Sequence, residues 1–266
     1  MTKQDILTHL PADHPWADLI QCFDTIDSTN TYAKKLAAAG APEGTILISA
    51  HQTAGRGRMG RTFHSPQAQG VYLSVILRPN CLPTELMHLT CATGTVMCDA
   101  VSRCAGFRPG IKWINDLVYQ GRKLGGILTE LGFDIKTGLV SYAVVGIGIN
   151  CSQSAADFPP EIREIAGSLS AAAGKPISPE ETAAAIIQEL YFLRQALLGE
   201  QEYLMNRYRM DCITIGKTVR IMSNPPRQGF AEDVDDAGGL IIRFDDGHRE
   251  TVSAGEVSVR GMYGYV

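Results

Sequence analysis

Three arginines and three glycines alternate within seven residues, Gly55–Arg61, which read GRGRMGR. The glycines match G-x-G-x-x-G, the spacing of a dinucleotide-binding turn. That turn should open a helix and be followed about twenty residues later by an acidic side chain. Here Pro66 follows the last arginine by five residues, and no Asp or Glu occurs between Arg61 and Glu85. The context excludes a Rossmann turn. Because guanidinium groups suit carboxylate and phosphate oxygens, the stretch instead predicts an anion-binding loop.

Three further stretches combine apolar, strand-like runs with polar side chains or glycines. In Ile111–Asp116, IKWIND, a lysine, a tryptophan, an amide and a carboxylate occur close together. In Gly121–Glu130, GRKLGGILTE, paired glycines follow a lysine, and strand glycines often mark close approach to the backbone. The third stretch is Gly146–Asn150, GIGIN. Each also has a structural explanation: an Asx turn with an aromatic plug, an exposed turn lysine, and tight sheet packing. The patterns alone leave both explanations open.

The composition indicates a soluble globular protein in a reducing compartment. Of the 266 residues, 45% are hydrophobic and 20% are charged, and the formal net charge is −4. No overall positive field favours nucleic acid or an anionic membrane, so the arginine cluster indicates a local anion site. Seven cysteines without a C-x-x-C pair favour core thiols and a cytoplasmic location. The sequence has neither an apolar signal core nor a run of membrane-spanning length.

Hydrophobic periodicity predicts a mixed α/β body followed by a small β-rich tail. N-cap residues at Asp27–Asn30 introduce a helix that extends to about Ala37. Strands are expected at 44–50, 71–77, 111–119, 124–131 and 142–150, and helices at 86–104 and 179–198. From Ile213 onward, short β runs alternate with turn signals at 224–226, 238–239 and 246–247. We therefore expect a main domain over 1–210 and a small β barrel over 211–266.

Together these motifs resemble the biotin protein ligases, the biotin–[acetyl-CoA-carboxylase] ligases. The ordered matches are Asp27–Asn30 (DSTN), Gln52–Arg61 (QTAGRGRMGR), Lys112–Asp116 (KWIND), Lys123–Leu128 (KLGGIL) and Gly146–Asn150 (GIGIN). The resemblance implies a mixed, mainly antiparallel sheet with flanking helices, as in class II aminoacyl-tRNA synthetases. It makes residues 1–210 the domain that binds biotin and ATP. Phe63 departs from the family, where many members have tryptophan. Because 26 residues precede Asp27, we expect a short form without an N-terminal DNA-binding domain.

The resemblance implies a two-step reaction. Biotin and ATP form biotinyl-AMP and pyrophosphate, and a lysine of a biotin carboxyl carrier protein then accepts the biotinyl group. The glycine-rich loop is expected to fold over the reactive intermediate. Fixed positive charge would stabilise the anionic reactants, and the resemblance assigns catalysis to Lys123, Lys112 and Arg58. It assigns biotin binding to Ser28, Thr29, Asn30, Gln52, Gly55, Arg56, Gly57, Arg58, Lys123, Gly125, Gly126 and Gly148. It assigns nucleotide binding to Arg58, Arg61, Lys112, Trp113, Asn115, Asp116 and Asn150.

The expected small molecules are biotin and ATP, the latter with Mg²⁺. The metal ligands are left open, since Asp116 either orients Lys112 or holds Mg²⁺ through water. The expected protein partner is the carrier, without DNA or a membrane, and a homodimer is left open.

Two rival functions also remain. A lipoate or octanoate ligase has a related fold but lacks the GRGRxGR loop. A non-catalytic biotin-binding regulator should have lost its nucleotide-facing residues, which are present here.

Overall fold

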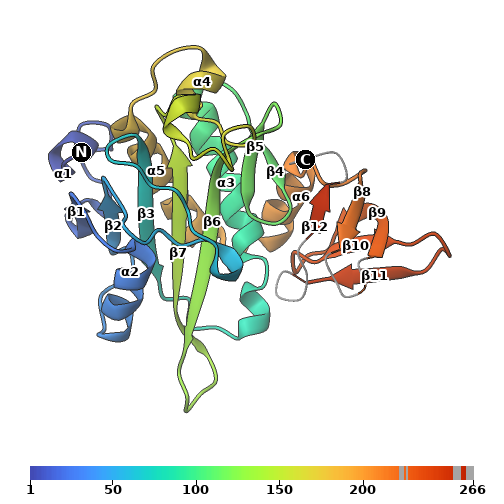
Figure 1. Ribbon diagram of the computed structural model, residues 1–266. Helices are drawn as coiled ribbons and strands as arrows, with labels where there is room; N and C mark the ends of the chain where they lie inside the picture. Colours follow the sequence, from blue (N-terminus) through green and yellow to red (C-terminus); the bar gives the residue numbers. More distant parts are fainter. Residues whose placement is uncertain (222–224, 226, 254–258, 262–266) are drawn as a thin grey trace.

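The fold is described from a computed structural model, shown in Figure 1, which covers residues 1–221, 225, 227–253 and 259–261. A seven-stranded sheet forms its centre, in the order β1-β2-β3-β7-β6-β5-β4. The strands are β1 (Ile20–Phe23), β2 (Ile46–Ser49), β3 (Gly70–Leu77), β4 (Gly110–Lys112), β5 (Asp116–Tyr119), β6 (Arg122–Phe133) and β7 (Val140–Asn150). Only the β1–β2 pair is parallel among these strands. This confirms the expected mixed, mainly antiparallel sheet.

Alternate residues of the central strands face two different layers. In β3, Leu73 and Val75 pack in the main core, whereas Ile76 packs in a smaller cluster with Ala33 and Val144. The main core lies under the helices α3 (Leu89–Ala105) and α5 (Pro179–Ala196), and α2 (Thr29–Ala38) covers part of the opposite face. Successive strand side chains point to opposite faces. The face packed against α3 and α5 is filled by the main core. On the opposite face, which α2 covers only in part, strand side chains remain available for a site.

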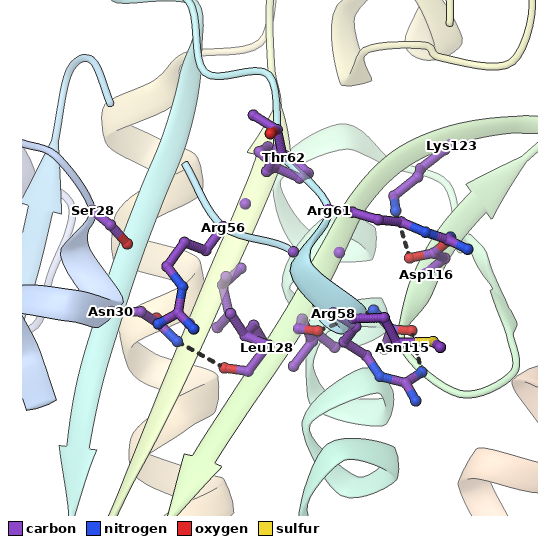
Figure 2. Close-up of a pocket in the computed structure, with 18 of the residues that line it drawn as sticks. Ser28, Asn30, Arg56, Arg58, Arg61, Thr62, Asn115, Asp116, Lys123 and Leu128 are labelled. Atoms are coloured by element: carbon purple, nitrogen blue, oxygen red, sulfur yellow. Dashed lines mark hydrogen bonds and ion pairs between the residues drawn. The ribbon is translucent and has the colours of Figure 1, made fainter. Parts of the chain in front are cut away.

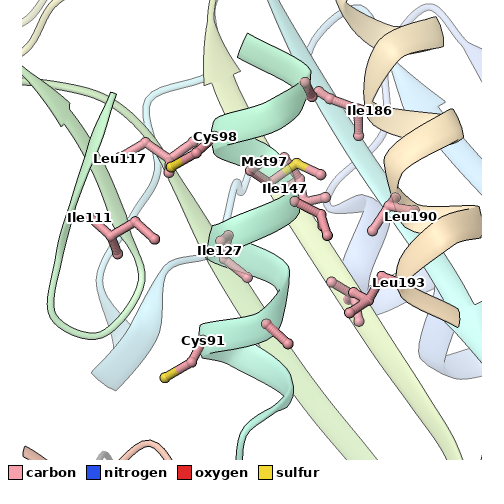
Figure 3. Close-up of a cluster of buried hydrophobic side chains, with 14 of the residues drawn as sticks. Cys91, Met97, Cys98, Ile111, Leu117, Ile127, Ile147, Ile186, Leu190 and Leu193 are labelled. Carbon is pink, nitrogen blue, oxygen red and sulfur yellow. The ribbon is translucent and has the colours of Figure 1, made fainter. Parts of the chain in front are cut away.

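The core between the sheet, α3 and α5 consists mainly of aliphatic side chains, with buried thiols among them (Figure 3). Met97 and Cys98 on α3 contact the sheet side, and Ile186 and Leu190 on α5 complete the cluster. All seven cysteines are free thiols, and six of them are buried. The expectation of core thiols is confirmed.

The predicted helix after Asp27 has the expected cap. The Ser28 hydroxyl accepts a hydrogen bond from the backbone N–H of Thr31, and the helix ends at Ala38. Such an N-cap satisfies a backbone donor that has no partner inside the helix.

The prediction of one strand over 111–119 is wrong. The chain instead forms a hairpin in which Lys112 pairs with Asp116. The chain turns there because Asn115 is hydrogen-bonded to the neighbouring strand β6. The Asn115 backbone carbonyl accepts from Ile127 N–H, and the Asn115 side-chain amide donates to the Ile127 carbonyl.

Several short elements were not among the sequence-based expectations. They are the strand β1, the helices α1 (Lys3–Leu7), α4 (Leu169–Ala173) and α6 (Gln201–Asp211), and the 3₁₀ turns η1 (Ala17–Leu19), η2 (Arg58–Gly60), η3 (Pro83–Leu86) and η4 (Ala155–Asp157). Of these, η2 lies in the arginine loop. No helix in the described ranges combines the length and apolar character that a membrane span requires.

The β-rich tail forms a second sheet with the order β11-β10-β9-β8-β12. Its strands are β8 (Thr218–Ile221), β9 (Arg227–Val234), β10 (Leu240–Arg243), β11 (Arg249–Val252) and β12 (Val259–Gly261), and all its pairs are antiparallel. The expected turns at 238–239 and 246–247 connect β9 to β10 and β10 to β11. The turn signal at 224–226 includes Asn224 and Pro226, which lie outside the described residues. Because β11 and β12 stand at opposite ends of this order, closure into a barrel stays a prediction.

Candidate active site

A cavity of about 540 Å³ lies on the α2 face of the main sheet, beneath the arginine loop (Figure 2). All but three of the residues predicted from the sequence line it. They are Ser28, Thr29, Asn30, Gln52, Arg56, Gly57, Arg58, Arg61, Lys112, Trp113, Asn115, Asp116, Lys123, Gly126 and Gly148. Residues from the N-cap of α2, the loop, the β4–β5 hairpin and the strands β6 and β7 are thus brought to one place.

Gly55, Gly125 and Asn150 lie outside the lining. A Cβ at Gly55 would come within 2.5 Å of the Phe63 carbonyl oxygen, so this glycine serves the packing of the loop base. Gly125 faces away from the cavity, and a Cβ there would meet the Gly148 oxygen at 2.5 Å. The Asn150 amide is buried and donates 2.9 Å to the Gly167 carbonyl. These three residues shape the neighbouring backbone.

One end of the cavity is rich in uncharged hydrogen-bonding groups. Gln52 Oε1 accepts from the backbone N–H of Thr29 at 2.9 Å and from its hydroxyl at 3.1 Å. Ser28 accepts from Thr31 N–H, and a hydroxyl that accepts in this way can also donate to a ligand. The Asn30 side chain is already hydrogen-bonded within the protein. Its Nδ2 donates to the Leu128 carbonyl, and its Oδ1 accepts from the Ser74 hydroxyl. This end offers a pre-formed set of donors and acceptors.

The floor of the cavity is formed by β6 and β7, which carry glycines at three lining positions. Gly126 on β6 is paired in register with Gly148 on β7, and Leu128 with Gly146. A Cβ at Gly148 would lie 2.6 Å from the Phe63 ring, and one at Gly146 would lie 1.9 Å from Asn30 Oδ1. Gly148 and Gly146 therefore make room for the Phe63 ring and the Asn30 side chain, which lie directly over the strands. At Gly126 a Cβ would lie no closer than 3.4 Å to Asp116 and Lys123, so the bare strand can be approached there.

The arginine loop closes the cavity and is bonded on two sides. We call residues Gly55–Arg61 the lid. At its base Gly57 N–H donates to the Arg61 carbonyl at 2.7 Å, and Phe63 N–H to the Gly55 carbonyl at 2.9 Å. At its tip Arg58 Nη1 donates to Asn115 Oδ1 at 3.0 Å. The lid thus contacts the β4–β5 hairpin across the cavity, as Figure 2 shows.

The other end of the cavity is strongly cationic. Four basic side chains line it, from Arg58, Arg61, Lys112 and Lys123, and among the described lining residues Asp116 supplies the one carboxylate. Arg56 lies at the other end, beside Asn30, and both bond the Glu130 carboxylate (Figure 2). Lys123 Nζ donates to Asp116 Oδ1 at 2.6 Å (Figure 2), which fixes the ammonium inside the cavity. This excess of positive charge stands in a chain whose formal net charge is −4. It suits a ligand that carries several negative charges.

Arg58 lies half-buried at this end. Burial lowers the pKa of its guanidinium, and the Asp116 carboxylate opposes that effect. An arginine pKa starts so high that the group stays charged near neutral pH. Taking this cation partly out of water strengthens its attraction for an anion. The lid tip is therefore a site for an anionic ligand.

Several lining residues were not assigned from the sequence. They are Met59, Thr62, Phe63, Ile127, Leu128 and Ile165, whereas Gly146 and Ile147 belong to the GIGIN stretch that the sequence had singled out. Strand alternation could have indicated Leu128, which shares a face with Gly126. The same alternation extends to Glu130, whose carboxylate binds Arg56 of the lid at 3.0 and 3.1 Å. Ile165 comes from a loop, and no local pattern marks it.

The described residues contain no group of three or more His, Cys, Asp or Glu side chains that could hold a metal ion. Asp116 is therefore the available protein ligand at the cationic end, and Lys123 already bonds one of its oxygens. Mg²⁺ commonly keeps several waters and binds through substrate phosphates with one or two carboxylates. The residues present fit a Mg²⁺ ion that arrives with a nucleotide and is held mainly by it.

Two family descriptions match the chain: the biotin/lipoate A/B protein ligase family over residues 22–150, and the biotin protein ligase C-terminal domain over residues 214–260. The chain is 34% identical to the bifunctional ligase/repressor BirA of Bacillus subtilis, over 87% of this chain and 71% of that relative. It is 32% identical to the biotin–[acetyl-CoA-carboxylase] ligase of Mycobacterium tuberculosis, over 86% of this chain and 85% of that enzyme.

Solved structures give the same result. The biotin protein ligase from Aquifex aeolicus, determined with biotin and ATP, superposes with a TM-score of 0.77 at 26% identity, over 91% of this chain and 98% of that one. The Leishmania major enzyme with biotinyl-5-AMP gives a TM-score of 0.61 at 25% identity, over 88% and 98% of the two chains. Sequence, fold and domain content agree, and the chain belongs to the biotin protein ligase family.

Proposed function

We propose that this chain is an ATP-dependent biotin protein ligase that activates biotin as biotinyl-5′-AMP and transfers it to a lysine of a carrier protein. The observation that carries the proposal is the composition of one cavity. A polar end of hydroxyl and amide groups, a strand left bare at Gly126 and a cationic end adjoin one another beneath a single lid. Biotin has a urea group, an apolar ring system and a carboxylate, and ATP adds phosphates at the carboxylate. The cavity matches that order of groups.

At the polar end, Ser28, Thr29 and Gln52 would bind the ureido ring, since they present both donors and acceptors. Asn30 supports this wall through its bonds to Ser74 and Leu128. Gly126 would let the ring system approach the bare strand, beside the Phe63 ring that lies over Gly148. A small number of fixed polar groups on an otherwise apolar pocket is the usual basis of small-molecule specificity.

At the cationic end, an oxygen of the biotin carboxylate attacks the α-phosphorus of ATP. The bond from that phosphorus to the bridging oxygen breaks, and pyrophosphate leaves. Lys123, Lys112 and Arg58 would stabilise the negative charge that shifts among these oxygens, while Arg61 and Trp113 add to the nucleotide wall. Fixed charges that already point at the reacting atoms are often the largest catalytic contribution. No protein nucleophile is required.

In the second step the carrier lysine nitrogen attacks the biotinyl carbonyl carbon. The carbon–oxygen bond to AMP breaks, AMP leaves with the electron pair, and the amine loses a proton. The lid must exclude water before this step and then admit the lysine. The hydrogen bond from Arg58 to Asn115 gives the lid a defined closed position.

The remaining assignments are also proposals. The relatives named for acetyl-CoA carboxylase support a biotin carboxyl carrier domain as the acceptor. We propose a catalytic domain over 1–210, a small C-terminal domain over 211–266, and a cytoplasmic, reducing setting for the seven free thiols. Mg²⁺ would accompany ATP, neutralise phosphate charge and leave the positioning to the cationic side chains.

The test is ATP–pyrophosphate exchange with purified chain and either biotin or lipoate as the acid. Exchange that depends on biotin and is absent with lipoate is expected, followed by transfer of radiolabelled biotin to a carrier domain. Exchange driven by lipoate would instead establish a lipoate ligase. Biotin binding without exchange would establish a non-catalytic regulator.

A further inference from the structure

Glu130 lies on β6 beside the cavity, and three side chains converge on its carboxylate. Lys34 Nζ donates to Oε1 at 2.8 Å, and Asn30 Nδ2 donates to Oε2 at 3.1 Å. Arg56 Nη1 lies within 3.1 Å of both oxygens. The Glu130 side chain is 17% exposed, so most of these contacts are shielded from water.

The three partners come from two different elements. Asn30 and Lys34 belong to α2, whereas Arg56 belongs to the lid. Glu130 itself is fixed in the middle of the sheet, where it pairs with Val144 of β7. One carboxylate therefore joins the lid and the helix to the central sheet.

The charges favour this arrangement. Burial would raise the pKa of Glu130, but the hydrogen bonds from Lys34 and Asn30 and the charge of Arg56 outweigh it, so the pKa is lowered. Glu130 is thus ionised near neutral pH and accepts charge-assisted hydrogen bonds, which are stronger than neutral ones. Exposed ion pairs contribute little, and the partial exposure of Arg56 and Lys34 keeps the expected effect moderate.

Arg56 also anchors the lid backbone. It forms an isolated antiparallel bridge with Thr62, on the other side of the lid. Holding Arg56 in place therefore holds both ends of the loop that carries Arg58 to Asn115. Without this anchor, the hydrogen bond from Arg58 to Asn115 and the lid's own short-range bonds would remain to keep the lid closed.

We propose that Glu130 is a positioning residue that holds the lid closed through Arg56 and orients the Asn30 side of the cavity. Arg56 acts as the anchor of the lid, and Arg58 and Arg61 supply the lid charges that face the reactants. The consequence for retention of biotinyl-AMP rests on the proposed function. The closure itself can be measured without any ligand.

The first experiment uses limited trypsin digestion of the ligand-free full chain, with cleavage after Arg58 and Arg61 followed by mass spectrometry. In Glu130→Gln the side chain keeps its shape and an acceptor for Asn30 but loses its charge. We expect lid cleavage to become about 3- to 10-fold faster. Glu232→Gln is the matched control, because Glu232 also binds two arginines, Arg243 and Arg249, in the C-terminal sheet. Equal lid cleavage in the two variants would overturn the proposal.

The second experiment asks whether the effect acts through Arg56. Arg56→Gln should accelerate the same cleavages, and the double variant Arg56→Gln/Glu130→Gln should be no faster than the faster single variant. Such non-additivity is the signature of a direct interaction. Additive effects would assign Glu130 to general stability and overturn its positioning role. Thermal unfolding of each variant identifies any that are globally destabilised.

The third measurement is the dissociation rate of biotinyl-AMP, which we expect to rise 3- to 10-fold (about 1 kcal/mol) in Glu130→Gln. An unchanged rate, with faster lid cleavage, would overturn the link to retention. If the parent chain forms no biotinyl-AMP, the proposed function fails, and the protease results still decide whether Glu130 closes the lid.

Discussion

The indole Nε1 of Trp113 donates a 2.9 Å hydrogen bond to the carbonyl of Gly238. Trp113 lines the cavity, whereas Gly238 belongs to the turn between β9 and β10 of the C-terminal sheet. The backbone N–H of Trp113 donates to the hydroxyl of Thr214, also in the tail. Both N–H groups of this wall residue are therefore held by the C-terminal part of the chain.

Gly238 can make this approach because it has no side chain. Its φ is +89°, and a Cβ would lie 2.8 Å from Cys91 Sγ. Gly238→Ala should displace the turn, release Trp113 and raise the KM for ATP about 10-fold, the scale of one lost buried hydrogen bond. The KM for biotin should change less than twofold. Gly247→Ala is the control, with a similar φ of +87° and open space around its Cβ. Equal effects of the two substitutions would remove the turn from the nucleotide site.

Lys123→Ala should slow biotinyl-AMP formation by about 100-fold or more, the scale of losing one transition-state donor. The fold should persist, because the backbone N–H of Lys123 still donates to the Ile165 carbonyl and its carbonyl still accepts from Gly167. Single-turnover formation of the adenylate measures the effect, with Lys136→Ala as an exposed lysine control. A rate within threefold of the parent would remove Lys123 from catalysis.

His88 should make stability depend on pH. Its Nε2 donates to the Leu197 carbonyl at 3.0 Å, and its buried Nδ1 has no hydrogen-bond partner within the described residues. Burial lowers the pKa of His88, although the bond to Leu197 partly opposes this. As the pH falls, His88 is therefore protonated in the unfolded chain before it is protonated in the folded chain. The contribution of His88 to the free energy of unfolding is fully present above about pH 6.5 and declines below it.

His88→Gln retains a donor for Leu197 and removes the titration. The free energy of unfolding of the variant should decline less between about pH 6.5 and 4.5, with each unit of pKa difference worth about 1.4 kcal/mol. Chemical denaturation at several pH values measures this, and the exposed His9→Gln serves as control. A parallel decline in parent and variant would exclude His88 as the source.

Local signals in the sequence predicted the elements that depend on near neighbours. The N-cap at Ser28 needs only Thr31, three residues away, so the helix after it was predictable. The glycines of β6 and β7 were also visible in the sequence. Their pairing, Gly126 with Gly148, depends on strand register, which no local pattern fixes.

Contacts between distant residues could not be predicted in this way. Arg56 and Glu130 are 74 positions apart, and Trp113 and Gly238 are 125 positions apart. From sequence alone Arg56 is one more cation for the reactants, because its anionic partner lies on another element. The strand predicted over 111–119 failed for the same reason. Bonds from Asn115 to Ile127 turn the chain there, and an apolar run gives no sign of them.

The last prediction concerns retention of the intermediate by Arg58. This residue lies at the lid tip and bonds Asn115, whereas Lys123 is fixed on a strand. A charge-assisted hydrogen bond to biotinyl-AMP would contribute roughly 1.5–3 kcal/mol, or about a 10- to 150-fold change in affinity. Arg58→Gly should therefore still form biotinyl-AMP but release it 10- to 150-fold faster.

Met59→Gly separates the loss of charge from added flexibility, because it introduces glycine at the next lid position and removes no cation. Met59 is 69% exposed and already has a φ of +55°, so glycine fits there without strain. Released adenylate acylates nearby amines, so Arg58→Gly should also biotinylate a bystander protein in the same reaction. Rapid release by both variants would assign retention to lid rigidity. Tight retention by Arg58→Gly, with labelling confined to the carrier, would show that the Arg58 charge does not hold the intermediate.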